Sequence, residues 1–168
     1  MHIRPRTAAD FTSLVELARM VQEHDGYPPH LPGGDYRQFL ESGDPLAAWV
    51  AEEAGRCVGH VSLNESTSPA VLGLAARTLG RDPTEFGVVA RLMVDTQMRR
   101  SGLGRTMLDH AAAACFERGL TPILDVVDRF APAIALYERA GWSSLGSVEV
   151  QLGDSATLRE YVYTVDVR

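Results

Sequence analysis

The segment that most constrains the fold is residues 88–114, in which a strand, a glycine turn and a helix follow one another. Residues 88–94 are apolar and β-branched apart from Arg91, as in a largely buried strand. The helix has one apolar face, whose members recur at spacings of three and four: Leu103, Met107, Ala111, Ala114 and Cys115. The segment therefore predicts a helix that packs against a buried strand.

The turn between this strand and this helix spans residues 99–105 and combines two glycines, Gly102 and Gly104, with three arginines. The first N–H groups of a helix have no partner within the helix, and the helix dipole makes that end positive. Phosphate is the commonest ligand of such a strand–turn–helix site. The turn therefore predicts a site for a phosphate-bearing ligand.

Composition narrows the class of protein. The chain has 168 residues, which predicts a single domain over residues 1–168, and its net charge of −6 argues against general nucleic-acid binding. No run of residues is apolar enough for a membrane helix, and the first ten residues lack the apolar centre of a signal peptide. A cytoplasmic protein away from membranes is expected. Cys57 and Cys115 show no metal-ligand spacing, so no metal is expected.

The other segments predict alternating strands and helices. They are an extended start at 2–6, a helix ending before Gly26, a short helix at 35–40, strands at 47–52 and 56–64, a helix between Pro69 and Gly80, a strand at 122–127, a helix at 131–139, and strands at 142–152 and 157–167 with a turn at Gly153 and Asp154. The strand–helix–strand order in the middle implies a parallel pair, and the hairpins imply antiparallel neighbours. The fold class is therefore α/β, a mixed sheet with helices on both faces, and the helix after Pro69 is expected over the sheet edge near the site.

A second segment, Ala133 to Trp142, reads AIALYERAGW. Together with the glycine turn, it resembles the GNAT superfamily of acyl-CoA-dependent N-acetyltransferases. Residues 99–104 fit that family's Arg/Gln-x-x-Gly-x-Gly/Ala pyrophosphate loop, and the second segment is similar to its A-I-x-L-Y-E-x-x-G-F/W motif. The resemblance covers nearly the whole chain. It implies a GNAT-like fold, a mostly antiparallel twisted sheet whose central parallel pair splays apart.

The resemblance implies that acetyl-CoA is the co-substrate. Backbone N–H groups of the turn would hold its diphosphate, and the residues concerned are Arg99, Arg100, Ser101, Gly102, Leu103, Gly104 and Arg105. Main-chain groups of Met93 and Val94 would pair with the pantetheine arm as if it were another strand. Phe130 stands where the family often has an asparagine that holds the arm, so that hydrogen bond would be missing or supplied by another group, and Phe130 could instead pack against the cofactor.

Tyr137 matches the tyrosine that commonly protonates the departing thiolate in this family. The chemistry supports that role separately, because a phenol of pKa about 10 can donate a proton to a thiolate of pKa about 8.5 at little cost. The alternative is that Tyr137 is a core aromatic residue on an amphipathic helix.

No general base is evident in the sequence. Some family members carry a glutamate early in the central strand, where this chain has Val88. Glu85 could act through water or be an exposed carboxylate at the strand end, and His60 could face the site or be a partnered strand histidine. Arg91 could point toward the acceptor or pair with a carboxylate.

These features predict an N-acetyltransferase that acts on a primary amine, either of a small molecule or at a peptide N-terminus. The amine would attack the thioester directly in a ternary complex, with an N–H near Val94 steadying the oxyanion. The resemblance implies an acceptor pocket lined partly by the loop after the first helix, where Tyr27 lies. The alternative is a non-catalytic acyl-CoA sensor of the same fold. A longer acyl group and a homodimer stay open.

A dinucleotide-binding fold is the main competing interpretation. The sequence from Gly102 begins like a G-x-G-x-x-G motif. Its third glycine is replaced by Met107, which is too bulky for close helix–strand contact. Only one strand–helix–strand unit is predicted, and the turn lacks the lysine of a Walker motif. The residues therefore argue against nucleotide binding of these kinds.

Overall fold

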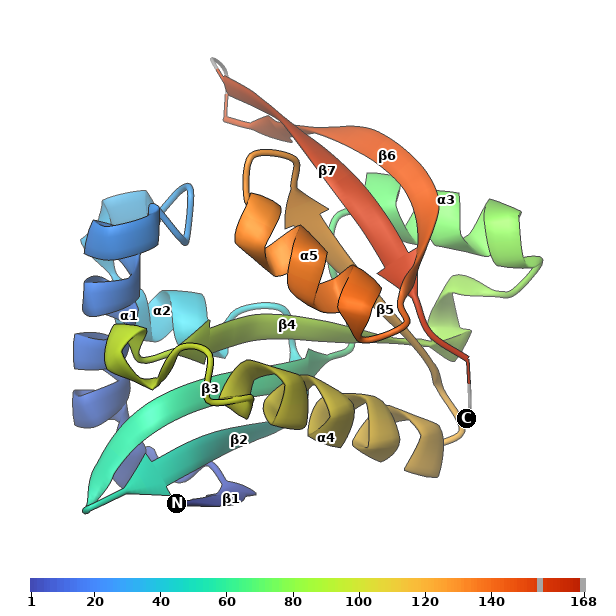
Figure 1. Cartoon of the computed structure of the whole chain (residues 1–168). Coiled ribbons are helices and arrows are strands. Elements are labelled where there is room, and N and C mark those ends of the chain that lie inside the picture. Colours follow the sequence, from blue (N-terminus) through green and yellow to red (C-terminus); the bar gives the residue numbers. More distant parts are fainter. Residues whose placement is uncertain (154–155, 167–168) are drawn as a thin grey trace.

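The computed structural model describes residues 1–153 and 156–166 and contains a mixed sheet of seven strands (Figure 1). The strands are β1 His2–Pro5, β2 Pro45–Glu53, β3 Arg56–Asn64, β4 Phe86–Val94, β5 Thr121–Val127, β6 Ser143–Leu152 and β7 Ala156–Thr164. Their order across the sheet is β1-β2-β3-β4-β5-β7-β6. Only β4 and β5 pair in parallel, and every other neighbouring pair is antiparallel. The predicted mixed sheet with a central parallel pair is confirmed.

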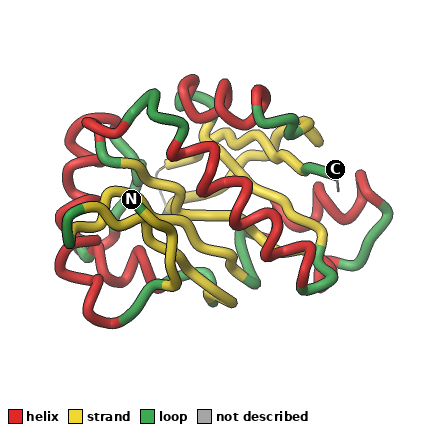
Figure 2. Tube along the Cα trace, turned by 60° about the horizontal axis from the view of Figure 1, so that its bottom comes forward, coloured by secondary structure: helices red, strands yellow, loops and turns green. Residues whose placement is uncertain are grey.

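Helices lie on both sides of the strands (Figure 2). They are α1 Phe11–Asp25, α2 Tyr36–Glu41, α3 Pro69–Leu79, α4 Leu103–Glu117 and α5 Ala131–Arg139. On one face α1 and α2 pack against β2 and β4, and α3 packs against β4, β5 and β7. On the other face α4 and α5 cover the centre of the sheet. Among the described residues, no helix is long and apolar enough to cross a membrane.

The central strand serves both layers because its side chains alternate between the two faces. Val88 packs in the cluster under α3, whereas Val89 packs in the cluster under α4. The predicted apolar face of α4 is confirmed, since its members are all buried: Leu103, Met107, Ala111, Ala114 and Cys115. A strand covered on both faces has the continuous apolar sequence that predicted it.

The boundaries of several elements differ from the predictions by a few residues. The central strand β4 begins at Phe86, two residues earlier than predicted, and β7, the strand that follows β6, begins at Ala156, one residue earlier than predicted. The predicted strand start at Trp142 is replaced by Ser143, and Trp142 is buried against the core instead. Backbone hydrogen bonds between strands decide where each strand begins and ends. The pattern of apolar side chains predicts these ends only to within one or two residues. Part of the predicted turn, at Asp154, and Val167 lie outside the described residues.

The segment between β3 and β4 forms α3, as predicted between Pro69 and Gly80. The helix packs against β6, the strand at the sheet edge, and against β7. The residues just before it, Ser66 to Ser68, reach the central cavity, whereas α3 itself does not line it. The expected position over the sheet edge is therefore correct for the helix, and its preceding loop makes the contact with the site.

Candidate functional site

A wedge opens where β4 and β5 separate (Figure 1). The two strands pair only over Phe86–Val88 with Thr121–Ile123. Beyond that point β5 stays paired with β7 while β4 stays paired with β3. A cavity of about 1610 Å³ fills this region, and its walls come from β4, β5, β7, α4, α5 and the loops around Tyr27 and Thr67. The sheet therefore creates a large site at its centre.

A β-bulge shapes the wall that β4 contributes. Arg91 has a φ of 54°, in the left-handed region, and it lies with Leu92 opposite a single residue of β3, Val61. A bulge adds one residue to one strand and redirects the groups that follow it. A non-glycine residue in this conformation costs on the order of 1 kcal/mol or more. The surrounding contacts hold it, and they place the Arg91 side chain at the cavity wall.

Backbone direction after the bulge identifies which groups face the wedge. The Asp95 N–H donates to the Val58 carbonyl at 2.9 Å, so Asp95 faces β3. Residues two apart on a strand direct their polar groups to the same side, so Met93 also faces β3. Val94 therefore directs its N–H and carbonyl toward the wedge. Of the two residues expected along the pantetheine arm, Val94 offers backbone groups there, whereas Met93 contributes part of the cavity wall.

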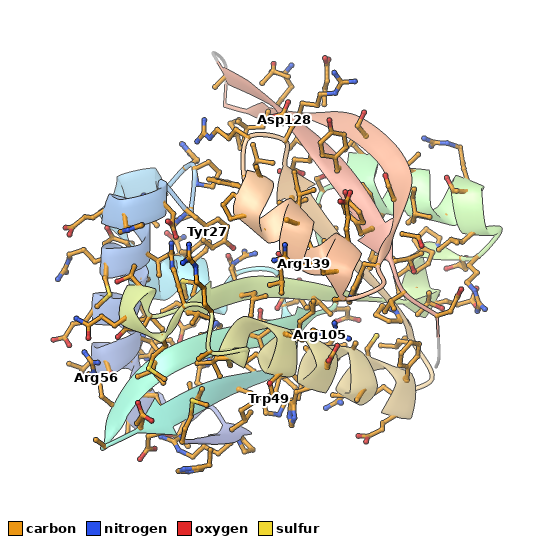
Figure 3. The ribbon with its side chains drawn as sticks, in the orientation of Figure 1. Tyr27, Trp49, Arg56, Arg105, Asp128 and Arg139 are labelled. Atoms are coloured by element: carbon orange, nitrogen blue, oxygen red, sulfur yellow. The ribbon has the colours of Figure 1, made fainter. Side chains whose placement is uncertain are left out.

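A buried carboxylate fixes the path from β4 to the glycine turn. Asp95 is 1% exposed, accepts the Gln97 N–H at 2.8 Å, and pairs with Arg56 at 3.1 Å. Arg56 marks this side of the molecule in Figure 3. Because a buried carboxylate is costly unless it is paired, these contacts hold the turn in one position relative to the sheet.

The start of α4 offers unpaired backbone donors. Gly102 has a φ of 86° and precedes the helix, and the Thr106 N–H donates back to its carbonyl at 3.0 Å. The Leu103 N–H is capped by the Ser101 hydroxyl at 3.3 Å. Among the described residues, no acceptor lies on the N–H groups of Gly104 and Arg105. These donors at a positive helix end fit the diphosphate predicted from the turn.

The three arginines of the turn differ in availability, although all line the cavity. Arg99 forms a two-pronged ion pair with Asp25 at the end of α1. Arg105 binds Asp109 at 2.7 Å and the Arg139 carbonyl at 3.2 Å, and Figure 3 shows Arg105 beside Arg139. Within the described chain, Arg100 has neither a hydrogen bond nor an ion pair. Arg100 is therefore the arginine most free to meet a phosphate.

Tyr137 lies on α5 and lines the cavity. Its hydroxyl has no hydrogen-bond partner among the residues described, and its ring lies 6.2 Å from that of Tyr163. Burial raises the pKa of Tyr137 above its usual range, and negative charge on Tyr27 or Asp125 would add to that rise. Tyr137 is therefore a protonated donor that is free to bind a group inside the cavity.

An aromatic corner joins the loop after α1 to the start of α5. The Tyr27 ring meets the rings of Phe39 at 5.8 Å and Phe130 at 5.9 Å, both edge to face. Figure 3 shows Tyr27 between α1 and α5. Burial raises the pKa of Tyr27, and the positive charge of Arg91 opposes that rise. Two residues predicted at the site, Tyr27 and Phe130, thus lie side by side at the wall.

Two carboxyl groups that the sequence did not single out lie in the same cavity. Asp125 on β5 and Glu160 on β7 are diagonal neighbours across the antiparallel pair, and their carboxyl groups are close enough for each to shift the pKa of the other. The Thr67 hydroxyl donates to Asp125, at 3.1 Å. Burial and the charge of Asp125 raise the pKa of Glu160 to about 7. Burial also raises the pKa of Asp125.

The sequence does carry a signal for this pair. Asp125 is the one charged residue in the apolar strand PILDVV, and Glu160 lies on the neighbouring strand. A charge inside a buried strand requires a partner or a function. The partner could not be recognised from sequence because the pairing of β5 with β7 brings together residues 35 positions apart.

Two residues considered as a general base lie away from the cavity. His60 is fully buried, its Nδ1 is 2.8 Å from the Arg91 carbonyl, and its Nε2 is 3.2 Å from Arg6. Because Arg6 can only donate, Nδ1–H is the donor to Arg91. Burial lowers the pKa of His60 to about 4, so the ring is neutral. Glu85 is exposed and accepts the Asp82 N–H at 2.8 Å. His60 supports the bulge, and Glu85 closes a turn.

Comparison with known structures supports the architecture. A ribosomal-protein-alanine N-acetyltransferase from Brucella melitensis is similar over 99% of this chain and 100% of its own, with 22% identity and a TM-score of 0.72. The yncA protein of Salmonella typhimurium, whose structure includes its cofactor acetyl-CoA, is similar over 98% and 92%, with 18% identity and a TM-score of 0.67. At these identities the likeness shows the fold alone.

Sequence comparison is more specific. No curated protein matches the sequence. The model of the acetyltransferase (GNAT) family matches residues 14–142, a span that runs from α1 through the wedge, the glycine turn and Tyr137 to the end of the second motif. The match covers well over half of the chain, and we conclude that this protein belongs to the GNAT family of acetyl-CoA-dependent N-acetyltransferases.

Proposed function

We propose that this protein transfers the acetyl group of acetyl-CoA to a primary amine by direct attack within a ternary complex. The observation that carries the proposal is that one cavity contains the start of α4, the free edge of β4, Tyr137 and the carboxyl pair of Asp125 and Glu160. These are an anion site, a strand edge, a proton donor and a proton acceptor. Together they supply what aminolysis of a thioester requires.

The cofactor would lie along the wedge from α4 to the carboxyl pair. Its diphosphate would accept hydrogen bonds from the N–H groups of Gly104 and Arg105, with Arg100 adding charge. Its pantetheine amides would pair with the free backbone groups of Val94. An N–H near Val94 would also steady the oxyanion that forms when the amine adds to the thioester carbonyl.

The carboxyl pair would prepare the amine. A protonated amine cannot attack, so one proton must leave the nitrogen first. With both carboxyls ionised, the pair of Asp125 and Glu160 can take that proton and hold it between them. Burial and the charge of Asp125 raise the pKa of Glu160 to about 7, so the pair accepts a proton near neutral pH more readily than an ordinary carboxylate does.

Tyr137 would act at the other end of the reaction. As the carbon–sulfur bond breaks, its hydroxyl donates a proton to the thiolate and CoA leaves as a thiol. Burial raises the pKa of Tyr137, and the same loss of hydration raises that of a thiolate released beside it. Of the two protons that the nitrogen loses, one leaves through the carboxyl pair and the other restores Tyr137.

Two measurements test this function together. Calorimetry should show acetyl-CoA binding, and a thiol-release assay over a broad panel of amines should show acetyl transfer to at least one class. Binding of acetyl-CoA without transfer to any amine would favour the alternative, an acyl-CoA sensor. Absence of binding at millimolar acetyl-CoA would contradict both functions.

A further inference from the structure

The cavity carries opposite charges on two of its walls, one formed by β4 and the other by β5 and β7. Arg91 contributes a guanidinium from β4, and Asp125 and Glu160 contribute carboxyls from β5 and β7. The positive charge of Arg91 lowers the pKa of Asp125 against the rise caused by burial, so the groups influence each other across the space. No ion pair joins them. A ligand can therefore lie between them.

Arg91 is held in place without being neutralised. Its Nε donates to the Phe39 carbonyl at 3.1 Å, one Nη donates to the Ser42 hydroxyl at 2.7 Å, and its guanidinium stacks on the Phe39 ring at 4.7 Å. Both acceptors are uncharged, and no carboxylate of the described chain lies within ion-pair distance. The remaining N–H donors keep the planar fork that recognises carboxylate and similar anions. The residue is thus a prepared anion-binding group.

The opposite wall is suited to an ammonium group. Asp125 and Glu160 place two neighbouring carboxyls on this wall, and each influences the pKa of the other. Asn64, which is 1% exposed, lines the cavity beside Arg91, since its amide donates to the Ser42 carbonyl at 3.2 Å, and its Oδ1 has no hydrogen-bond partner within the described chain. A buried acceptor of this kind is costly unless a donor reaches it. The carboxyl pair of Asp125 and Glu160 thus offers acceptors to the nitrogen of a bound amine, and the Asn64 oxygen can accept from a donor that lies nearer Arg91.

We infer that the acceptor is an amino-acid-like zwitterion, a primary amine that carries a carboxylate, with its nitrogen at Asp125 and Glu160 and its carboxylate at Arg91. This inference rests on the proposed acetyl transfer and names its substrate class. Arg91 places positive charge where the carboxylate of the ligand would lie, and the carboxyl pair, when ionised, places negative charge where its ammonium group would lie. The rings of Tyr27 and Phe39 and the side chains of Leu152 and Leu158 line the same cavity, so an apolar body fits between the charges.

The test compares matched acceptors that differ only in the anion. Leucine, methionine and phenylalanine are each assayed by thiol release beside their amides and their decarboxylated amines, and rates are expressed per fraction of neutral amine. Wild-type protein should give a kcat/KM at least tenfold higher for the amino acid than for its amide or its decarboxylated amine. Arg91→Gln should remove that preference, and Arg91→Lys should restore part of it because the charge returns.

The outcomes separate the inference from the function on which it rests. Acetylation of the decarboxylated amines as fast as the amino acids, in wild type, would overturn the zwitterion and leave acetyl transfer intact. A preference that survives Arg91→Gln would overturn the role of Arg91. Binding of acetyl-CoA with no transfer to any of these amines would overturn the inference, and transfer to amines outside this set would then decide whether the proposed function also fails. Calorimetry on Arg91→Gln confirms that cofactor binding is preserved.

Discussion

The two ends of the central cavity are built in different ways. At the end where we propose that the cofactor diphosphate binds, called the cofactor end below, the start of α4 offers backbone N–H groups of consecutive residues, and one glycine conformation organises them. At the end where we propose that the amine binds, called the acceptor end below, the walls offer side chains from β4, β5 and β7 that no short segment of the chain brings together. Backbone recognition suits a cofactor that every family member shares. Side-chain recognition allows the acceptor to change while the cofactor site stays the same.

The largest effect is expected where the two ends meet, at the proposed proton donor Tyr137. Tyr137→Phe removes the hydroxyl that would protonate the thiolate and leaves the ring in place. We expect kcat to fall by about 10²- to 10⁴-fold, the usual contribution of a general acid. The dissociation constant of acetyl-CoA from calorimetry should change little, because the phosphate donors are on α4.

Tyr161→Phe is the matched control, since Tyr161 lies on β7 and does not line the cavity. This variant also loses a tyrosine hydroxyl, but one outside the cavity, and it should keep wild-type turnover. Equal turnover in wild type and Tyr137→Phe would show that Tyr137 is not the general acid.

The acceptor end should respond to pH. Glu160 has its pKa raised to about 7, and its ionised form is the one that accepts a proton. The kcat/KM for the amine should therefore rise with pH through a limb near 7. Glu160→Gln should lower kcat/KM by about 10²-fold and remove this limb, while acetyl-CoA affinity stays close to wild type.

Glu149→Gln is the control for this variant, because Glu149 is exposed on the neighbouring strand β6. Its pH profile should match that of wild type. A limb near 7 that persists in Glu160→Gln would assign the titration to another group. Asp125 is the other member of the pair, and the neighbours that influence it or line the same cavity are Arg91, Thr67, Tyr27 and Tyr137.

His60, which hydrogen-bonds to the Arg91 carbonyl at the bulge, should make the free energy of unfolding fall at acid pH. His60 is buried and neutral, with its pKa lowered to about 4. The contribution of neutral His60 to the free energy of unfolding is complete above about pH 6.5, the pKa of histidine in the unfolded chain, and it is lost as pH falls toward 4. Glu160 acts oppositely, because its raised pKa favours the folded state as pH falls below about 7. The pH dependence of wild-type stability alone would therefore not reveal the effect of His60, because the opposite effect of Glu160 offsets it.

His60→Gln isolates the effect. Denaturant unfolding should show the variant less stable than wild type at pH 7, and the difference should shrink by about 2 kcal/mol at pH 5, since only wild type must protonate a buried histidine. His2→Gln is the control because His2 is exposed. A constant difference at both pH values would show that His60 is charged or free to leave its site.

The smallest effect belongs to the cofactor end. Gly102→Ala places a Cβ on a residue with a φ of 86°, which should cost about 1 kcal/mol and weaken acetyl-CoA binding about fivefold. Gly104→Ala is the comparison, because a Cβ there meets Leu136 at 3.4 Å and Val94 at 3.6 Å, which are ordinary contacts. Calorimetry of both variants should rank Gly102→Ala as the weaker binder, and the reverse order would move the organising glycine to position 104.

Much of the fold could be predicted from the sequence because its signals are local. The apolar run before the turn, the helical spacing after it and the glycines between them each report on neighbours in the chain. The parallel centre of the sheet followed from the strand–helix–strand order. Element ends shifted, as at Phe86, since hydrogen bonds to other strands decide where a strand begins.

The features of the site also separate into those that depend on adjacent residues and those that depend on strand pairing. The sequence by itself determined the family motifs, the phosphate turn from Arg99 to Arg105 and the place of Tyr137, because backbone turns and helix positions depend on adjacent residues. Only the tertiary structure decided that His60 lies beneath the bulge, that Arg91 stays unpaired at the cavity wall, and that Asp125 meets Glu160. Strand pairing brings those residues together, and their charges and burial follow from neighbours that are distant in the chain.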